Sequence, residues 1–198
     1  SQGNLESTDI LFTKGKVAKL GKNIAAPKGA TVIDATGKHV TTGLIDCHSH
    51  TAISEGVNEA GQAISAEVRI ADVVDSKDVA IYRELAGGLT VINALHGSAN
   101  PIGGQNQVLK LRWGALPDQM KFEGAPEGIK FALGENPKQS NWGDRYNTRY
   151  PQTRMGVEQI IRDLAIMCLP SGQAEPDREP LRIDDRVDFG REPASGAT

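Results

Sequence analysis

The stretch that decides the fold is Gly43-Leu44-Ile45-Asp46-Cys47-His48-Ser49-His50, an apolar run that ends in two histidines. The run is typical of a β-strand, and successive side chains of a strand point to opposite faces. His48 and His50 are two positions apart, so we expect both on one face at the end of the strand. Two imidazoles in this arrangement predict a pair of ligands for one divalent ion such as zinc, against the alternative of two ordinary surface or core histidines.

The composition is that of a soluble globular protein. Hydrophobic residues make up 38% of the 198 residues and charged residues 24%, and the net charge of −3 gives no reason to expect nucleic-acid binding. No run approaches the roughly 18 apolar residues of a membrane span, so none is predicted. Cys47 and Cys168 are too few for a disulfide framework, and Cys47 is expected to be a small buried residue. No secretory signal is visible at Ser1, but Ser1 resembles an interior position, so no compartment is predicted.

The residues before Gly43 alternate between apolar and polar positions, as half-buried antiparallel strands do. Two pairs of short strands are expected here: 9–12 with 16–20 around a turn at Lys14-Gly15, and 31–34 with 39–41 around a turn at 36–38.

From Gly43 onward the pattern changes to strands that alternate with helices, which predicts an α/β fold with parallel strands. Residues after about Leu169 are rich in proline and charge and have almost no apolar pattern, so an irregular or disordered tail is expected at 169–198. The expected strands are 43–48, 89–95, 107–113 and 128–133, and the expected helices are 76–86, with Ser76 as N-cap, and 155–167.

Several stretches together resemble the amidohydrolase superfamily, and within it the imidazolonepropionase-like group. They are 32–38 with 43–50, then 95–105, then Gly134-Glu135-Asn136-Pro137-Lys138, and the resemblance continues to about Asp163. It implies a (β/α)₈ barrel that carries a small β-sandwich, with chemistry at the C-terminal ends of the barrel strands. It also implies hydrolysis of a C–N bond, in an amide, a cyclic amide or a peptide-like substrate, by water activated on one or two divalent metal ions. His48 and His50 match the metal ligands of the first barrel strand.

Lys130 is the next candidate ligand. Ile129, Phe131 and Leu133 share one face of their strand and Lys130 lies on the other, so Lys130 points into the barrel if the apolar three pack against helices. The resemblance implies a lysine at this position that is carboxylated by CO₂ and bridges two metal ions. The alternatives are a lysine whose ammonium reaches solvent at a strand edge, and Glu135 as the anionic ligand.

His96 ends the second expected strand and opens a glycine-rich loop. It is predicted to bind substrate, and the alternative is a loop histidine bonded to nearby backbone. The loop lacks the Gly-Lys-Ser/Thr ending of a phosphate-binding loop, so that function is set aside. Arg149 and Arg154 are interpreted as surface charges rather than as receptors of a substrate carboxylate.

The chain departs from the family in what it lacks. Family members carry further histidine ligands after the fifth and sixth strands and a general-base aspartate after the eighth, whereas this sequence has no histidine after His96 and no aspartate that ends a credible strand. No catalytic base is therefore assigned. The sequence predicts a fragment, with β-sandwich strands at 1–42, about the first four barrel strands at 43–168, and the tail at 169–198. From about Leu164 on, the residues are interpreted as unrelated or out-of-frame sequence.

Three functions follow from these observations. The first is a metal-dependent hydrolase of C–N bonds. In this case the chain is a fragment that is inactive alone, and an oligomer is possible for the full-length parent. The second is a non-catalytic metal-binding or interaction module built on half a barrel. The third, weaker one is an unrelated barrel enzyme in which the two histidines coincide by chance.

Overall fold

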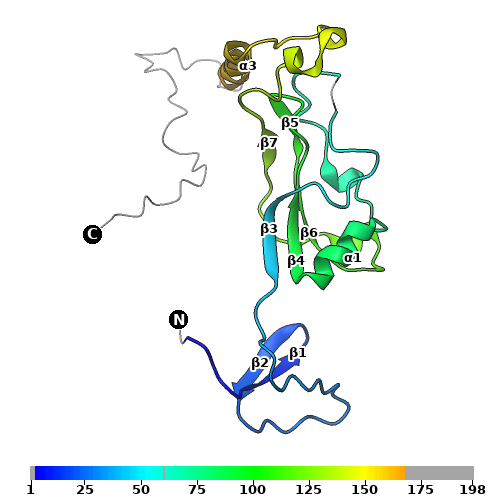
Figure 1. The fold of residues 1–198 in the computed structure, drawn as a ribbon, viewed down its shortest axis with the longest axis vertical. Coiled ribbons are helices and arrows are strands. Elements are labelled where there is room, and N and C mark those ends of the chain that lie inside the picture. Colours follow the sequence, from blue (N-terminus) through cyan, green and yellow to red (C-terminus); the bar gives the residue numbers. More distant parts are fainter. Residues whose placement is uncertain (1–2, 60, 168–198) are drawn as a thin grey trace, which may run out of the picture. The chain divides into compact units, whose positions relative to one another are not determined.

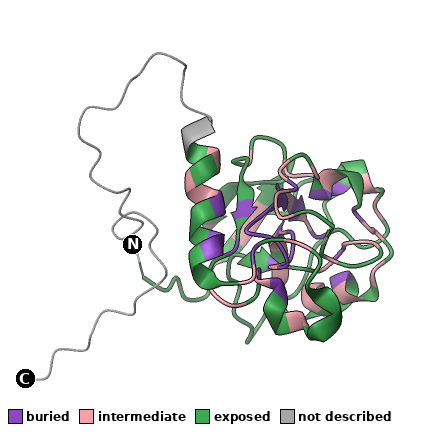
Figure 2. Cartoon of the chain, turned by 90° about the horizontal axis from the view of Figure 1, so that it is seen from above, coloured by how far each residue is buried: buried purple, intermediate pink, exposed green. Residues whose placement is uncertain are grey.

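The computed structural model describes residues 3–59 and 61–167. The chain divides into two compact units, Ser1–Gly43 and a second that begins at Leu44. Cys168 and the tail predicted at 169–198 lie outside the described residues. Figure 1 shows the elements of both units, and Figure 2 shows that the buried positions gather in the second, whereas residues 3–43 are exposed or partly exposed throughout.

The first unit is built on one antiparallel hairpin of β1 (Asp9–Thr13) and β2 (Lys16–Gly21). Its two-residue turn, Lys14-Gly15, has φ values of +51° and +74°, the positive pair that a type I′ hairpin turn requires. The prediction of this hairpin is confirmed.

The second predicted strand pair of this unit is wrong. The turn near Gly37 forms, closed by a hydrogen bond from the Lys38 amide to the Ala35 carbonyl, but its flanks are not paired as strands. Val32 and Ile33 are 74% and 82% exposed. A two-stranded ribbon has little stability without a surface to pack on, and no described residues cover the apolar side chains of this segment.

The second unit contains two small sheets. β3 (Leu44–Ser49), β4 (Leu89–Ala94) and β6 (Gln107–Lys110) form one sheet in the order β3-β4-β6. β5 (Ile102–Gln105) pairs with β7 (Ile129–Phe131) in the other. The fold is therefore mixed α/β, as predicted.

The prediction of parallel strands is confirmed for β3 and β4 and wrong for the other pairs. β6 runs antiparallel to β4, and β7 runs antiparallel to β5. A parallel return needs a long crossover, usually a helix. A helix joins β3 to β4, but the segment between β4 and β6 contains β5 instead, which the sequence pattern did not predict.

The helices are α1 (Val79–Ala86), the single turn α2 (Pro117–Met120) and α3 (Arg154–Met167), with 3₁₀ turns at Ile70–Asp72, Gln139–Trp142 and Asp144–Tyr146. α3 agrees with its predicted range. α1 begins later than predicted, and its N-cap is Asp78, not Ser76. The reason is local: the Asp75 carboxylate accepts the Lys77 amide hydrogen and holds this stretch in a turn ahead of the helix.

The core of the second unit lies where α1 meets the sheet. Ile81 of α1 and Ile92 of β4 are fully buried in this cluster, which also contains Ala52, Ile70, Val74, Ala94, Leu109, Leu111 and Met120. No helix among the described residues has the length and apolar character to cross a bilayer.

The outer strand faces are not covered. Leu44 and Ile45 on β3 are 61% and 72% exposed, and Cys47, predicted to be buried, is exposed as well. β3 stands at one end of its sheet, so the described chain supplies no neighbour on that side.

The apolar face of β7 is also open. Ile129, Phe131 and Leu133 are between 38% and 47% exposed, so the condition attached to the Lys130 prediction, that these three pack against helices, is not met in the part of the chain that the structure describes. Lys130 nevertheless lies on the opposite, buried face, as the alternation of the strand predicts.

Candidate metal centre

His48 and His50 lie at the C-terminal end of β3 and immediately beyond it. Ser49 between them is buried, 6% exposed, whereas both histidines are exposed, so at this end of the strand the two rings lie on the face opposite Ser49. The two imidazole rings lie edge to face with their centroids 5.2 Å apart. The rings are therefore close enough for one ion to contact both.

Lys130 joins this pair from a different sheet. Its side chain is on the buried face of β7, 9% exposed, and its Nζ atom lies 3.2 Å from the Nε2 atom of His48. A lysine amine has only hydrogens to give when it is protonated, so in this contact the ammonium donates to the imidazole lone pair. The structure thus brings together Lys130 and the histidine pair, the three residues predicted as metal ligands.

Backbone and carboxylate partners orient the histidines. The Nδ1 atom of His50 lies 2.9 Å from the Leu95 carbonyl oxygen, which can only accept, so Nδ1 carries the proton and the Nε2 lone pair is left for a ligand role. The His48 amide donates to the Asp46 carboxylate at 3.0 Å, which stiffens the strand end. The sequence pattern identified neither partner, because a backbone carbonyl has no residue-type signature and Asp46 reads as an ordinary strand residue.

The surroundings lower the pKa of both nitrogen groups. Burial, then the positive charges of Lys130 and His50, lower the pKa of His48 below its ordinary value, while Asp46 opposes the shift. Burial also lowers the pKa of Lys130. Metal ions bind unprotonated nitrogen, so these shifts move the site toward the form that can hold a metal.

His96 lies at the end of β4 and is almost fully buried, 2% exposed. Both of its ring nitrogens are engaged by backbone: Nδ1 lies 2.9 Å from the Gly97 carbonyl, and Nε2 accepts the Glu59 amide at 2.9 Å. A Cβ at Gly103 would come within 2.7 Å of the His96 ring, which explains a glycine there without any phosphate. These contacts describe a histidine that ties two loops together, and its role toward substrate stays a prediction.

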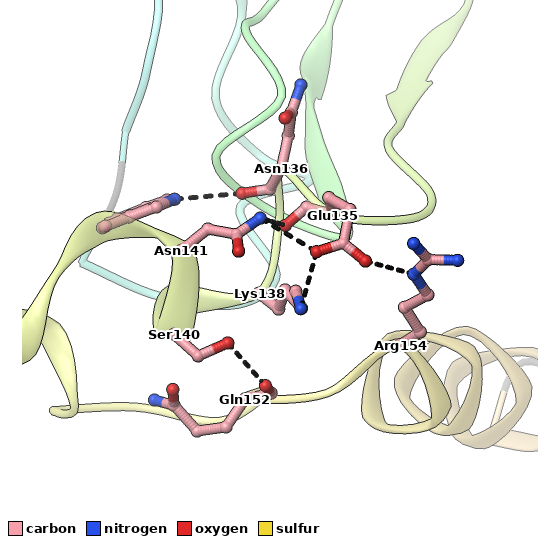
Figure 3. A network of polar contacts seen from close by, with 8 residues as sticks. Glu135, Asn136, Lys138, Ser140, Asn141, Gln152 and Arg154 are labelled. Atoms are coloured by element: carbon pink, nitrogen blue, oxygen red, sulfur yellow. Dashed lines mark hydrogen bonds and ion pairs between the residues drawn. The ribbon is translucent and has the colours of Figure 1, made fainter.

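Glu135, the rival anionic ligand, lies in a cluster of polar groups after β7 (Figure 3). Its carboxylate binds Lys138 Nζ at 2.6 Å and also pairs with the Arg154 side chain, and Asn141 donates to it at 3.2 Å. Lys138 first and Arg154 second lower the pKa of Glu135 to about 2. A carboxylate held by two cations is poorly placed to serve a metal, so the geometry favours Lys130 as the third ligand.

Arg149 is not the ordinary surface charge that the sequence suggested. Its side chain is partly buried and donates from Nη2 to the Ala99 carbonyl at 2.7 Å, in the loop that follows His96. Its guanidinium carbon lies 5.2 Å from the centre of the Trp142 ring, a cation–π contact. Arg154, by contrast, is 70% exposed and fits the surface interpretation.

The donor set fits a divalent ion that prefers nitrogen, but it is small. Over 3–59 and 61–167, no three His, Cys, Asp or Glu side chains gather closely enough to hold a metal. The third partner of the two histidines is an amine, which becomes an anionic oxygen ligand only if it is carboxylated. The described residues therefore bring two imidazoles and one amine together, and a metal bound there stays a prediction.

Comparison with known proteins gives the family of the chain. A crystal structure of an amidohydrolase from Thermotoga maritima superposes with a TM-score of 0.70 and 38% sequence identity, and covers 80% of this chain. The amidohydrolase tasK of Hapsidospora irregularis is 32% identical over 174 residues, 78% of this chain. The chain belongs to the amidohydrolase superfamily. A dihydroorotase of Geobacter sulfurreducens is 56% identical over a shorter stretch of 50 residues, 25% of this chain. No protein-family model matches.

The amidohydrolase relatives are much longer than the matched region. This chain spans 17% of the length of tasK, 12% of the Geobacter dihydroorotase and 42% of the Thermotoga maritima chain. The narrower resemblance to the imidazolonepropionase-like group stays a prediction, because the relatives compared here are named amidohydrolase and dihydroorotase.

Proposed function

We propose that this chain supplies the metal-ligand portion of an amidohydrolase that hydrolyses C–N bonds in amides or cyclic amides. The observation that carries the proposal is the meeting of Lys130 Nζ and His48 Nε2 at 3.2 Å, next to the His50 ring. The superfamily membership and the pair of histidines at a strand end support it. In this proposal β3 and β4 are early strands of a (β/α)₈ barrel and residues 1–42 belong to a small β-sandwich.

The residues of the chain have separate roles in this proposal. His48 and His50 hold a divalent ion, zinc in the first instance, through neutral ring nitrogens, and the Leu95 carbonyl keeps His50 in the required tautomer. The metal, when bound, supplies an activated water and polarises the scissile carbonyl.

Lys130 has a chemistry of its own. A neutral amine is the form that attacks CO₂, forming a bond from Nζ to the carbon and releasing one proton to solvent. The burial that lowers the Lys130 pKa favours this neutral form. The resulting carbamate would supply an anionic oxygen ligand, which the described residues near the two histidines lack. Glu135 stays the alternative ligand.

The names of the relatives suggest the substrate class. Several are dihydroorotases, whose name specifies a cyclic amide, and tasK is named only as an amidohydrolase. For this chain we propose a small-molecule or peptide-like amide, cyclic or linear, as the substrate.

The test is made on the natural gene product that carries this sequence. After loading with zinc, it is assayed for hydrolysis of a panel of dihydroorotate, N-acyl amino acids and dipeptides. Hydrolysis that falls at least about 10²-fold in His48→Ala, in line with the loss of metal-activated water, is expected. A protein that retains no metal and hydrolyses none of these compounds contradicts the proposal.

A second candidate is a non-catalytic metal-binding or interaction module. The observation that favours it is that two histidines and one lysine meet, with no third His, Cys, Asp or Glu ligand among the described residues. Tight, stoichiometric zinc binding that His48→Ala abolishes, in a gene product that hydrolyses none of the amides, would select this function over the first.

A further inference from the structure

Thr51, the residue that follows the histidine pair, is hydrogen-bonded to a side chain of α1. The Thr51 hydroxyl donates to Oε1 of Glu84 at 2.6 Å, and both groups are partly buried. A hydroxyl that donates to a carboxylate at this distance makes a charge-assisted hydrogen bond, roughly twice as strong as a neutral one. Glu84 therefore anchors the chain one residue beyond His50.

The next residue is anchored to the same helix. Asp78 accepts the Ala80 amide at 2.9 Å as the N-cap of α1, and with its other oxygen it accepts the Ala52 amide at 2.9 Å. The Ala52 carbonyl accepts the Asp75 amide at 2.9 Å. Ala52 itself is fully buried with a φ of +62°, a backbone region that an alanine keeps only where its surroundings enforce it.

The Glu84 carboxylate is not explained by the stability of α1. Its Oε2 atom is buried and has no hydrogen-bond partner among the described residues, and an unsatisfied buried acceptor costs stability. An apolar residue at this position would avoid that cost. What the carboxylate does supply is the contact with Thr51, beside a metal-ligand candidate.

We propose that Glu84 is a positioning residue, which acts through Thr51 to hold His50 where its Nδ1–H meets the Leu95 carbonyl and its Nε2 lone pair is left for a metal. The metal-binding role rests on the proposed function, whereas the hydrogen bonds that position His50 do not depend on it. His50 is held from β4 through Leu95 and its neighbour Thr51 is held from α1, and these two elements share the buried core formed around Ile81 and Ile92.

The rival interpretation is that the Thr51–Glu84 hydrogen bond only docks α1. The two interpretations differ in the His50 ring, so the experiment reads the ring nitrogens. The metal-free 198-residue chain is labelled with ¹⁵N, and the ring shifts of its four histidines are assigned with the His50→Gln variant. The wild type and Thr51→Ser, which keeps the hydroxyl, are expected to show the Nδ1–H tautomer at His50.

Thr51→Val and Glu84→Met remove the hydrogen bond at nearly constant volume, and a mixture of His50 tautomers is expected in both. Affinity for added Co²⁺, followed by its visible absorption, is expected to fall about 10- to 100-fold in the same two variants. Glu67→Gln is the matched control, because it removes an exposed carboxylate that makes no hydrogen bond or ion pair among the described residues, and it should change neither readout.

The outcomes distinguish a failure of the Glu84 proposal from a failure of the proposed function. If Thr51→Val and Glu84→Met lower the unfolding midpoint but leave the His50 tautomer as in the wild type, Glu84 is only structural and the proposal is wrong. If neither the wild-type chain nor the natural gene product that carries it binds Co²⁺, the proposed function fails, while the tautomer comparison, which needs no metal, still decides for or against Glu84. Should Thr51→Val not fold, Glu84→Met with Thr51→Ser as its folded reference gives the same comparison.

Discussion

Lys130 Nζ and His48 Nε2 lie 3.2 Å apart although 82 positions separate the two residues in the chain. The contact joins β7 to the end of β3, strands of two different sheets. Two groups that are both cationic when protonated repel each other, so their proximity is stable only when at least one of them is neutral. A neutral nitrogen with a free lone pair is also what the proposed metal site requires of its ligands.

The first prediction concerns the charge that Lys130 places on His48. Lys130→Met keeps the apolar stem and removes the ammonium, so the pKa of His48 is expected to rise, though not to its ordinary value, since burial is the larger cause of the shift. The pKa is followed by NMR titration of the His48 ring. Lys77→Met, which removes an exposed lysine, is the control, and equal His48 pKa values in the two variants would contradict the prediction.

The second prediction is the pH dependence that His48 gives to stability. Its pKa is lowered on folding from an ordinary value of 6.5, so between these two values the unfolded chain binds more protons than the folded one. The His48 contribution to the free energy of unfolding therefore decreases as the pH falls through this window and is constant above it. Urea unfolding at about pH 8 and about pH 5 should show a smaller pH-dependent loss in His48→Gln than in the wild type.

The third prediction concerns Glu135 and its two cationic partners. The folded pKa of about 2 lies below the ordinary 4.5, so the carboxylate stabilises the fold above pH 4.5 and loses this contribution as the pH falls toward 2. Glu135→Gln should unfold at lower urea concentration than the wild type at neutral pH and lose less stability on acidification. Because the group is at the surface, added salt should reduce the difference. Glu67→Gln, with the same change of charge, should leave the acid profile unaltered.

The fourth prediction tests the packing of the second unit. Ile92 lies on the middle strand of its sheet and is fully buried, so Ile92→Ala is expected to cost about 2–5 kcal/mol of the free energy of unfolding. Ile45 on the neighbouring strand is 72% exposed, and Ile45→Ala is expected to change stability by no more than about 0.5 kcal/mol. Similar losses in the two variants would mean that β3 is covered in solution by something the described residues do not supply.

The fold could be predicted from the sequence where the signal is local. The Lys14-Gly15 hairpin and α3 follow from turn chemistry and helical periodicity within a few residues. The direction of β6 and the existence of β5 could not be predicted, because strand pairing depends on distant partners and four residues with two glycines do not read as a strand. The prediction of strands around Gly37 was wrong for the same reason. Alternation indicates which face of a strand is apolar, but it does not show that another element is present to cover that face.

The candidate site divides in the same way. The two-residue spacing places His48 and His50 on one face, and the alternation of β7 predicts that Lys130 points away from its apolar neighbours. The contact between His48 and Lys130 was expected only from family resemblance, since no local pattern joins two strands so far apart. The roles of the Leu95 carbonyl and of Glu84 came from the structure alone, because each acts through a backbone group or a neighbour rather than through a motif.

Whether these residues hold a metal ion is decided by a zinc titration of the chain by calorimetry, on the wild type and on His48→Ala, His50→Ala and Lys130→Ala. We expect saturable binding by the wild type, loss of at least about tenfold in affinity in each histidine variant, and a smaller loss in Lys130→Ala when CO₂ is excluded. Wild-type affinity in both His48→Ala and His50→Ala would contradict the assignment of these histidines as metal ligands.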